Sequence, residues 1–379
     1  MEHHFVQEDI NDSMTWMAPL AESAKKLVHE LRSFDVKYKK LDESVLYAIA
    51  ASRLAAADAN WQNDTDFGIN LGSSRGATAL FENYHKEYLE TGRASTLSSP
   101  TTTLGNISSW VSHDLGTQGP EISHSITCST GLHSVLNGIA WINSGMADRF
   151  LVGGSEAPLT AFTIAQMKAL KIYASSLAST TKPRGGKHLS VQDQNRINYP
   201  CQALNLEKEY NSLILGEGAS VACLERGVKD EAMALIAGVG YATEVLEHNT
   251  SISTDAVCFQ KSMKMALGDK NPSEIDVIVM HAPGTMKGDA SEYNAIQKVF
   301  GPRTPFLTSN KWKLGHTFAP SGMFNLEMAV LMLMYNQVVK VPYLDEEPFK
   351  GNVDKVMVNA VGFGGNAVSI LLVRAETSA

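Results

Sequence analysis

The sequence predicts an α/β fold made of two packed halves, and three observations lead to this. Segments with helical spacing alternate with short apolar segments of strand type over most of the 379 residues. A similar order of strands and helices occurs before and after about residue 230, although no residue-level repeat is visible. The chain is also too long for a single small core. We therefore expect one half at 1–228 and the other at 229–379.

The first half contains one clear helical pattern and two clear strand patterns. Residues 41–59 have helical spacing, with Asp42 and Ser44 as candidate N-terminal caps. Residues 67–74, FGINLGSS, are typical of a buried strand that ends in a Gly-Ser turn. Residues 149–157, RFLVGGSEA, repeat this form.

The remaining elements follow from the same two patterns. Residues 172–199 are polar and predict an exposed loop or insertion, after which 213–226 resume a strand. A helix is expected around AVCFQKSMKMAL, followed by a strand within 274–285 that ends on a histidine. Residues 355–375 contain two β-rich runs around glycines, which predict a hairpin.

Composition excludes several classes of protein. The hydrophobic fraction of 44% and charged fraction of 19% are typical of a soluble globular chain. A formal net charge of −8 gives no overall basic field for nucleic acid or an anionic membrane. No apolar run reaches the roughly 18 residues of a membrane span, and no secretion signal is visible at the start. We expect a cytoplasmic protein without a membrane span.

The four cysteines show no paired spacing, which argues against a zinc site or a disulfide framework, so we predict no metal and four free thiols. Cys128 stands out because a β-branched segment precedes it and a helical pattern follows it in SITCSTGLHSVLNGIAWINSG. Amides at a helix start favour a thiolate and can hold an oxyanion. A buried, unreactive thiol is an equally good interpretation of Cys128 taken alone. Cys201 is expected to be inert, and the remaining two are Cys223 and Cys258.

A nucleophilic cysteine needs polar partners, and two of the eleven histidines have suitable positions. His281 ends the strand pattern DVIVM and opens a glycine-containing loop. His316 lies five residues after Lys311, just ahead of a strongly apolar helix. Each histidine alone is compatible with a structural role, but two of them together with a helix-start cysteine indicate a reactive site.

Five short motifs occur in the order and spacing of one known enzyme family. From about residue 40 to its end, it resembles the β-ketoacyl-acyl-carrier-protein synthases, and among them the elongating enzymes with a Cys-His-His triad. Thiolases share this fold but carry a second catalytic cysteine in a C-terminal glycine loop, and Gly362–Asn366 contains none. The resemblance implies a thiolase-like, five-layered αβαβα fold. The motifs are TCSTG, GEGA, HAPGTMKGD, KWKLGHT and GFGGN.

The resemblance also implies a role for each matching residue. Cys128 would accept an acyl group from a carrier-protein thioester. After decarboxylation of malonyl-carrier protein, His281 and His316 would stabilise the enolate that attacks the acyl-cysteine. Lys311 would tune this site electrostatically, although a solvated lysine is the alternative. No cofactor is expected, because substrates arrive on the phosphopantetheine arm of the carrier protein.

Further residues gain roles in the same way. The backbone amides of Cys128 and Phe363 would form the oxyanion hole, and the Phe363 ring would gate the acyl pocket. Thr285 would contact pantetheine, whereas Glu217 is expected to be structural. The resemblance implies an acyl carrier protein as partner, and a homodimer or a heterodimer with a related ketosynthase-like subunit. Candidates for a basic docking patch are Lys168, Lys171, Lys182, Arg184 and Lys187.

The sequence departs from the family pattern in ways that suggest a specialised polyene (such as aryl polyene) or polyketide branch. Pro283 replaces a threonine, and Asn325 stands where a glutamate is common, with Glu327 placed to face elsewhere. The first strand motif is absent, so MTWMAPL either rebuilds the sheet edge or the edge is borrowed or lost. Two other functions stay open: a non-catalytic, chain-length-determining partner subunit, and a Cys-His thioester hydrolase.

Overall fold

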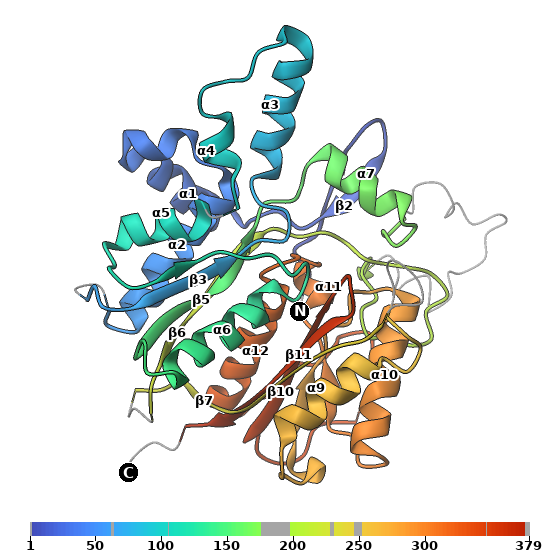
Figure 1. Ribbon diagram of the computed structural model, residues 1–379. Coiled ribbons are helices and arrows are strands. Elements are labelled where there is room, and N and C mark those ends of the chain that lie inside the picture. The colour runs from blue at the N-terminus through green and yellow to red at the C-terminus, as the bar shows by residue number, and fades with distance from the viewer. Residues whose placement is uncertain are drawn as a thin grey trace, which may run out of the picture.

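The computed structural model shows two sheets packed through a shared layer of helices (Figure 1). Much of the predicted loop at 172–199, with Lys182, Arg184 and Lys187, lies outside the described residues. The predicted boundary between 228 and 229 also lies outside the described residues, and it stays a prediction. The structure describes residues 2–61, 64–104, 106–175, 198–227, 231–245, 252–345 and 347–375.

The N-terminal half contains a four-stranded sheet in which β3 pairs in parallel with β4 and β5, while β6 runs antiparallel to β5. The residues of β3 are all buried, because helices cover both faces of the sheet. Helices α2 (Glu43–Asp58) and α5 (Asn106–Leu115) pack on its outer face. The strands, in sheet order, are β4 (Glu121–Ile122), β3 (Gly68–Gly72), β5 (Arg149–Glu156) and β6 (Gly218–Glu225).

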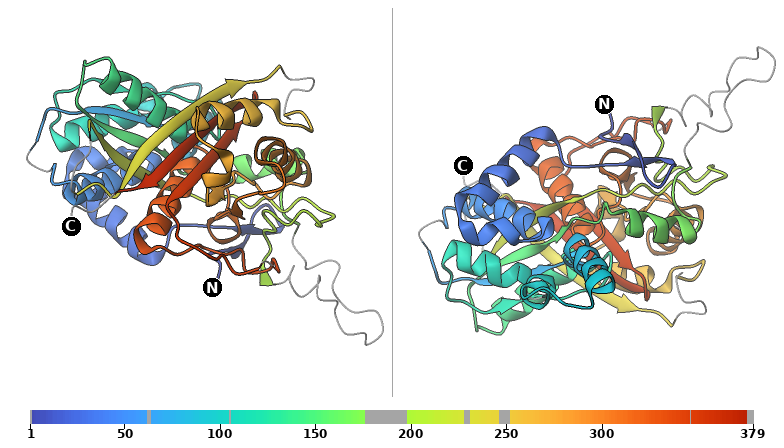
Figure 2. Two further views of the ribbon diagram at one scale, coloured as in Figure 1. Left: turned by 90° about the horizontal axis from the view of Figure 1, so that it is seen from below. Right: turned by 90° about the horizontal axis from the view of Figure 1, so that it is seen from above.

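The C-terminal half contains a five-stranded sheet, and its predicted hairpin is confirmed as the antiparallel pair β10 and β11. Figure 2 shows β7 beside the red strands of this hairpin. Helices α9 (Val257–Leu267) and α10 (Met286–Phe300) lie on the outer side. The strands, in sheet order, are β7 (Ala234–Thr243), β11 (Asn366–Arg374), β10 (Lys355–Gly362), β8 (Val277–Val279) and β9 (Phe306–Thr308).

Helices α6 (Thr130–Asn143) and α12 (Ser321–Tyr335) form the layer between the sheets, which confirms the five-layered αβαβα arrangement. Most residues of α12 are apolar, as expected for a helix buried on several sides. Glycine allows α6 to approach its neighbours closely. A Cβ on Gly131 would lie 2.6 Å from the carbonyl oxygen of Ala319, so the two halves meet directly at the start of α6.

Some predicted bounds are confirmed and others are corrected. Helix α2 matches the pattern at 41–59, and Asp42 caps it by accepting a hydrogen bond from the Ser44 amide at 2.9 Å. The strand predicted at 213–226 begins only at Gly218. The strand predicted within 274–285 is limited to β8, because the chain turns after it through Gly284, whose φ is +88°.

The N-terminal segment does not rebuild an edge of the four-stranded sheet. Its MTWM residues form β2 (Met14–Met17), which among the described strands pairs only with β1 (Val6–Asp9), as a hairpin. Beyond the hairpin, Ala18 alone forms an isolated bridge with Gly216. Helix α3 projects from the body of the molecule (Figure 1). The remaining helices are α1 (Glu22–Phe34), η1 (Val36–Lys40), α3 (Thr78–Thr91), α4 (Ser98–Thr102), α7 (Ala161–Ala169), η3 (Pro272–Glu274) and α11 (Lys311–Leu314).

Candidate active site

Cys128 lies in the turn between β4 and α6, just before the Ser129 N-cap rather than on the first helical turn. Thr127 precedes it with a φ of +48°, a left-handed conformation that is strained for a β-branched residue. Neighbouring hydroxyl groups hold this turn in place. Thr130 Oγ1 and Ser74 Oγ each donate to the Thr127 carbonyl at 2.6 Å. The thiol is 5% exposed, so its position is well defined by its surroundings.

The electrostatic surroundings of Cys128 correct the prediction that the helix start favours a thiolate. Burial, followed by the Glu156 carboxylate, raises the pKa of the Cys128 thiol to about 12. The backbone amides of Cys128 and Phe363 act in the opposite direction, as does the Lys311 charge. Burial and a nearby anion therefore outweigh the helix amides, and the thiol is protonated at neutral pH in the free protein.

The structure brings His281 and His316 together. Their ring centroids are 5.3 Å apart and the rings are nearly perpendicular, at 88°. Burial lowers the pKa of His316 to about 3, with a further contribution from Lys311. Burial also lowers the pKa of His281 well below its usual value, with contributions from His316 and Lys311. Both imidazoles are therefore neutral at pH 7, and each offers one N–H donor.

The hydrogen bonds of the two rings differ. His316 Nδ1 lies 2.9 Å from Ser321 Oγ. His281 Nδ1 is buried and has no hydrogen-bond partner among the described residues. A hydrogen bond at Nδ1 fixes the tautomer and orientation of an imidazole. Ser321 can thus orient His316, whereas the orientation of His281 comes from its backbone and its packing.

Sequence reasoning missed the group that holds the backbone of His281. Glu292, on α10, accepts hydrogen bonds from the amides of His281 at 3.0 Å and Ala282 at 2.9 Å. Asn359 Nδ2 donates to the same carboxylate at 3.2 Å. Burial raises the pKa of Glu292 to about 7. The only signal in the sequence was an acidic residue on the buried face of a helix, eleven positions after the histidine.

Lys311 is buried, with 1% of its surface exposed, which excludes the solvated alternative. Its Nζ donates to the side-chain oxygens of Asn310 at 3.2 Å and Asn325 at 3.1 Å. Burial lowers the pKa of Lys311 to about 8. Asn325, predicted as a departure from the family pattern, thus contacts the lysine through a neutral amide. Glu327 faces Ser220 instead, at 3.5 Å.

The end of β10 lies against the cysteine turn. A Cβ on Gly362 would lie 2.0 Å from Thr127 Oγ1 and 3.2 Å from the Cys128 nitrogen, so this contact requires glycine. The Phe363 carbonyl accepts a hydrogen bond from Thr127 Oγ1 at 3.3 Å. The Phe363 side chain is 38% exposed. Its predicted roles as an oxyanion-hole amide and as a gate stay predictions, and the backbone geometry is compatible with both.

Other predicted residues have local roles in the structure. Thr285 is the N-cap of α10 and accepts a hydrogen bond from the Gly288 amide at 3.1 Å, so its contact with pantetheine stays a prediction. Glu217 accepts from the Leu20 amide at 3.0 Å, which agrees with a structural role. Cys201 is fully buried. Lys168 donates to Thr15 Oγ1 at 2.6 Å, which leaves the basic patch a prediction.

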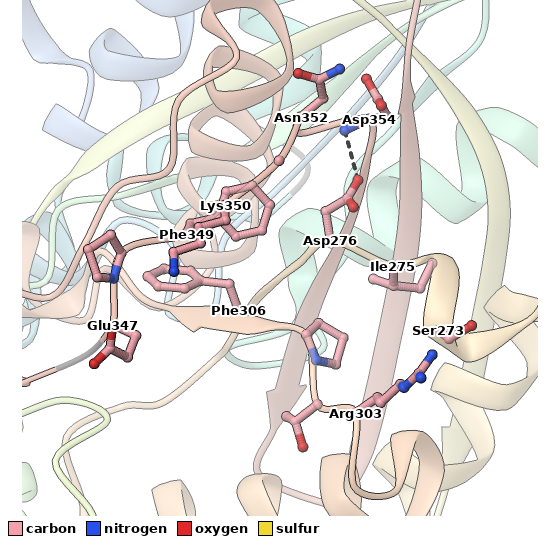
Figure 3. Close-up of a pocket in the computed structure, with 14 residues that line it drawn as sticks. Ser273, Ile275, Asp276, Arg303, Phe306, Glu347, Phe349, Lys350, Asn352 and Asp354 are labelled. Atoms are coloured by element: carbon pink, nitrogen blue, oxygen red, sulfur yellow. Dashed lines mark hydrogen bonds between the residues drawn. The ribbon is translucent and has the colours of Figure 1, made fainter.

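A surface hollow lies away from these residues (Figure 3). The rings of Phe306 and Phe349 meet there at 5.9 Å, and Asp276 accepts a hydrogen bond from the Asp354 amide at 2.8 Å. Asp276 comes just before β8, whereas His281 follows that strand. The hollow is therefore at the opposite end of the C-terminal sheet from the two histidines.

Metal-binding clusters and membrane-spanning helices are both absent from the part of the chain that the structure describes. Within it, no group of three or more His, Cys, Asp or Glu side chains could hold a metal ion. No helix in the same part is both long and apolar enough to cross a membrane.

Two halves that share a central helical layer, with a cysteine turn in one and paired histidines in the other, have the architecture of the thiolase-like ketosynthases. Comparison with models of known protein families agrees with this assignment. Residues 11–230 match the beta-ketoacyl synthase N-terminal domain, and residues 233–344 match the C-terminal domain of the same family. The chain belongs to the beta-ketoacyl synthase family.

Individual proteins show the same likeness. The chain is 26% identical to a 3-oxoacyl-[acyl-carrier-protein] synthase 2 of Staphylococcus aureus, over 91% of this chain and 86% of that protein. It superposes on the ishigamide ketosynthase/chain length factor with a TM-score of 0.79 and 20% identity, covering 99% and 93% of the two chains. A type II polyketide acyl-carrier protein in complex with its ketosynthase gives a TM-score of 0.77 at 19% identity, with the same coverage.

Proposed function

We propose that the protein catalyses the decarboxylating condensation of an acyl-enzyme thioester on Cys128 with malonyl-acyl carrier protein. One observation carries this proposal. A buried thiol from one half and two buried imidazoles from the other meet where the halves join. The two imidazole rings are 5.3 Å apart, and the Gly131 amide, just after Cys128, donates to the Ala319 carbonyl, just after His316, at 3.0 Å. A nucleophile together with neutral donors suits chemistry that passes through an oxyanion and an enolate.

The first step is acyl transfer. Cys128 sulfur attacks the carbonyl carbon of the acyl-carrier thioester, and a new C–S bond forms. The old C–S bond breaks, and the pantetheine sulfur leaves with the proton that the thiol releases. The amides of Cys128 and Phe363 would stabilise the tetrahedral oxyanion, a role supported by their lowering of the pKa of the Cys128 thiol.

The second step is decarboxylation and bond formation. The C–C bond to the malonyl carboxylate breaks, carbon dioxide leaves, and the electron pair is held as an enolate. His281 and His316 donate N–H hydrogen bonds to the enolate oxygen, for which neutral imidazoles are suited. The enolate carbon attacks the acyl carbonyl, the bond to Cys128 breaks, and the thiolate takes a proton from solvent. The product is 3-oxoacyl-carrier protein.

The comparisons support a carrier protein as the partner. The Staphylococcus relative is named as an acyl-carrier-protein synthase, and one structural neighbour is a ketosynthase in complex with its carrier protein. We place the reaction in fatty-acid, polyene or polyketide chain elongation, as a homodimer or a heterodimer. Pro283 and Asn325 favour a specialised branch over housekeeping fatty-acid synthesis.

A second candidate function is a non-catalytic subunit that sets chain length beside a sister synthase. The neighbour whose printed title includes a chain length factor favours this possibility. The presence of Cys128, His281 and His316, all of them buried, counts against it, because a subunit without catalysis needs none of them.

Intact-mass spectrometry tests the proposal. The protein is mixed with carrier proteins that bear saturated or polyunsaturated acyl chains, and then with malonyl-carrier protein. We expect a mass gain that Cys128→Ala abolishes, followed by discharge as a product two carbons longer. The best-loaded chain would indicate the pathway. If no chain loads the wild-type protein, the non-catalytic subunit becomes the better explanation, and hydrolysis without condensation would indicate a thioesterase.

A further inference from the structure

Glu156, the last residue of β5, is a fully buried carboxylate that the proposed reaction does not use. Such a group is costly unless hydrogen bonds satisfy it. Both of its oxygens are satisfied, by donors from two separate segments of the chain. The donors are Ser73 Oγ at 2.7 Å, the Ser74 amide at 2.7 Å, the Arg75 amide at 3.1 Å and the Ala319 amide at 3.3 Å.

The segments that Glu156 joins both lead to the proposed catalytic residues. Glu156 accepts a hydrogen bond from the Ser74 amide. The Ser74 hydroxyl in turn donates to the carbonyl of Thr127, next to Cys128. Ala319 lies three residues after His316, and its carbonyl accepts the amide of Gly131 at the start of α6. One carboxylate thus ties the cysteine turn of the first half to the histidine turn of the second.

Glu156 also affects the pKa of the Cys128 thiol. It is the largest charge effect on Cys128, and it raises the pKa of the thiol, whereas Lys311 on α11 lowers it. His281 and His316 face the site as neutral rings. Burial raises the pKa of Glu156 itself to about 7, despite its hydrogen bonds.

We propose that Glu156 is a positioning residue that fixes Cys128 against the turn carrying His316, and that its negative charge, held beside the cysteine turn through Ser74, restrains the reactivity of the thiol. The proposal rests on the proposed function for its meaning in catalysis. Its test does not, because the reactivity of Cys128 toward a small alkylating reagent can be measured without carrier proteins.

The experiment compares wild type with Glu156→Gln by the rate of Cys128 alkylation with iodoacetamide, followed by peptide mass spectrometry. Glutamine has nearly the same shape but no charge and only one accepting oxygen. We expect alkylation at pH 8 to be about tenfold faster in the variant, since one pKa unit changes the thiolate fraction tenfold. Acyl transfer from carrier protein should fall about tenfold, because the two turns are no longer tied together.

Two further variants separate charge from position. Glu156→Asp keeps the charge but has a shorter reach, so alkylation should stay within about twofold of wild type while acyl transfer falls. Glu292→Gln is the matched control, because Glu292 is equally buried and also accepts backbone amides. Its hydrogen bonds go to the amides of His281 and Ala282 rather than to the cysteine turn, so its loss should leave the alkylation rate unchanged.

Wild type alone provides a second test, which does not depend on whether a variant folds. Glu156 ionises near pH 7 and then opposes ionisation of the thiol, so the logarithm of the alkylation rate should flatten above about pH 7 before rising again. A straight line of unit slope would overturn the charge role.

Equal alkylation rates for folded Glu156→Gln and wild type would also overturn the charge role. Unchanged acyl transfer in that variant would overturn the positioning role. If wild type accepts no acyl chain at all, the proposed function fails, while the alkylation profile still decides the role of the charge.

Discussion

The two halves each place a buried glutamate beneath a reactive turn, but they use it differently. Glu292 stays within its own half, where it binds the amides of His281 and Ala282. Glu156 forms a hydrogen bond between the halves, because its donors include the amide of Ala319. The turn carrying His281 is therefore supported from within its own half, whereas the cysteine turn and the turn carrying His316 are joined across the two halves.

The charges of the two regions differ in the same way. Burial and then the Glu156 carboxylate oppose ionisation of the Cys128 thiol, while burial and the Lys311 charge suppress a positive charge on the histidines. These effects favour the neutral forms of the three residues in the free protein.

The largest effect is expected when one residue in each of the two regions is mutated in turn. His316→Ala should lower decarboxylation of malonyl-carrier protein by about 10²–10³-fold, because a donor to the enolate is lost. Acylation of Cys128 should change only a few-fold. Cys128→Ala should show the reverse, with no acylation but retained decarboxylation. Carbon dioxide release and intact mass measure the two activities. If His316→Ala abolishes both activities equally, the proposed division of labour is wrong.

A smaller effect is expected where β10 contacts the cysteine turn. Gly362→Ala introduces a Cβ that would lie 2.0 Å from Thr127 Oγ1, so the Phe363 amide must move away from the sulfur. We expect acyl transfer to fall roughly 10- to 100-fold, less than for complete loss of an oxyanion donor. Phe363→Ala is the matched control, because it keeps the amide and should change chain preference more than rate. Single-turnover acylation distinguishes these outcomes.

The smallest effect is expected at Lys311. Its folded-state pKa is lowered to about 8, so the cation is present below that pH and is lost as pH rises through it. If condensation needs the cation, activity should decline above about pH 8. Asn325→Glu places a carboxylate beside the cation and should move this decline upward by about one unit. A pH–rate profile measures the shift, and Asn325→Gln should leave it in place. An identical profile in all three proteins would show that Lys311 does not titrate during catalysis.

Much of the arrangement could be predicted from local patterns. Helix α2 and the β10–β11 hairpin have short-range signals, namely a cap and a glycine turn between β-rich runs. Cys128, His281 and His316 were found because each follows a recognisable strand or precedes a helix. The bounds of β8 were overestimated, because residues after it are apolar and buried without being part of the strand.

Glu156 and Glu292 could not be found in this way. Each is a single acidic letter in an apolar element, and its partners lie up to 163 positions away in the sequence. The effect of the helix start on Cys128 was also misjudged, because burial and a distant carboxylate determine the pKa of the thiol. Such properties depend on which groups the fold brings together, and no local pattern records them.

The sequence by itself determined the fold class, the order of the elements and the three residues that we propose for the centre of the site, because these depend on periodicity, turn residues and motifs of neighbouring positions. Only the tertiary structure decided the protonation of Cys128, the burial of Lys311 and the tie that Glu156 makes between the halves. Electrostatic interactions and desolvation act through space, so their strength is set by the packed arrangement of distant segments.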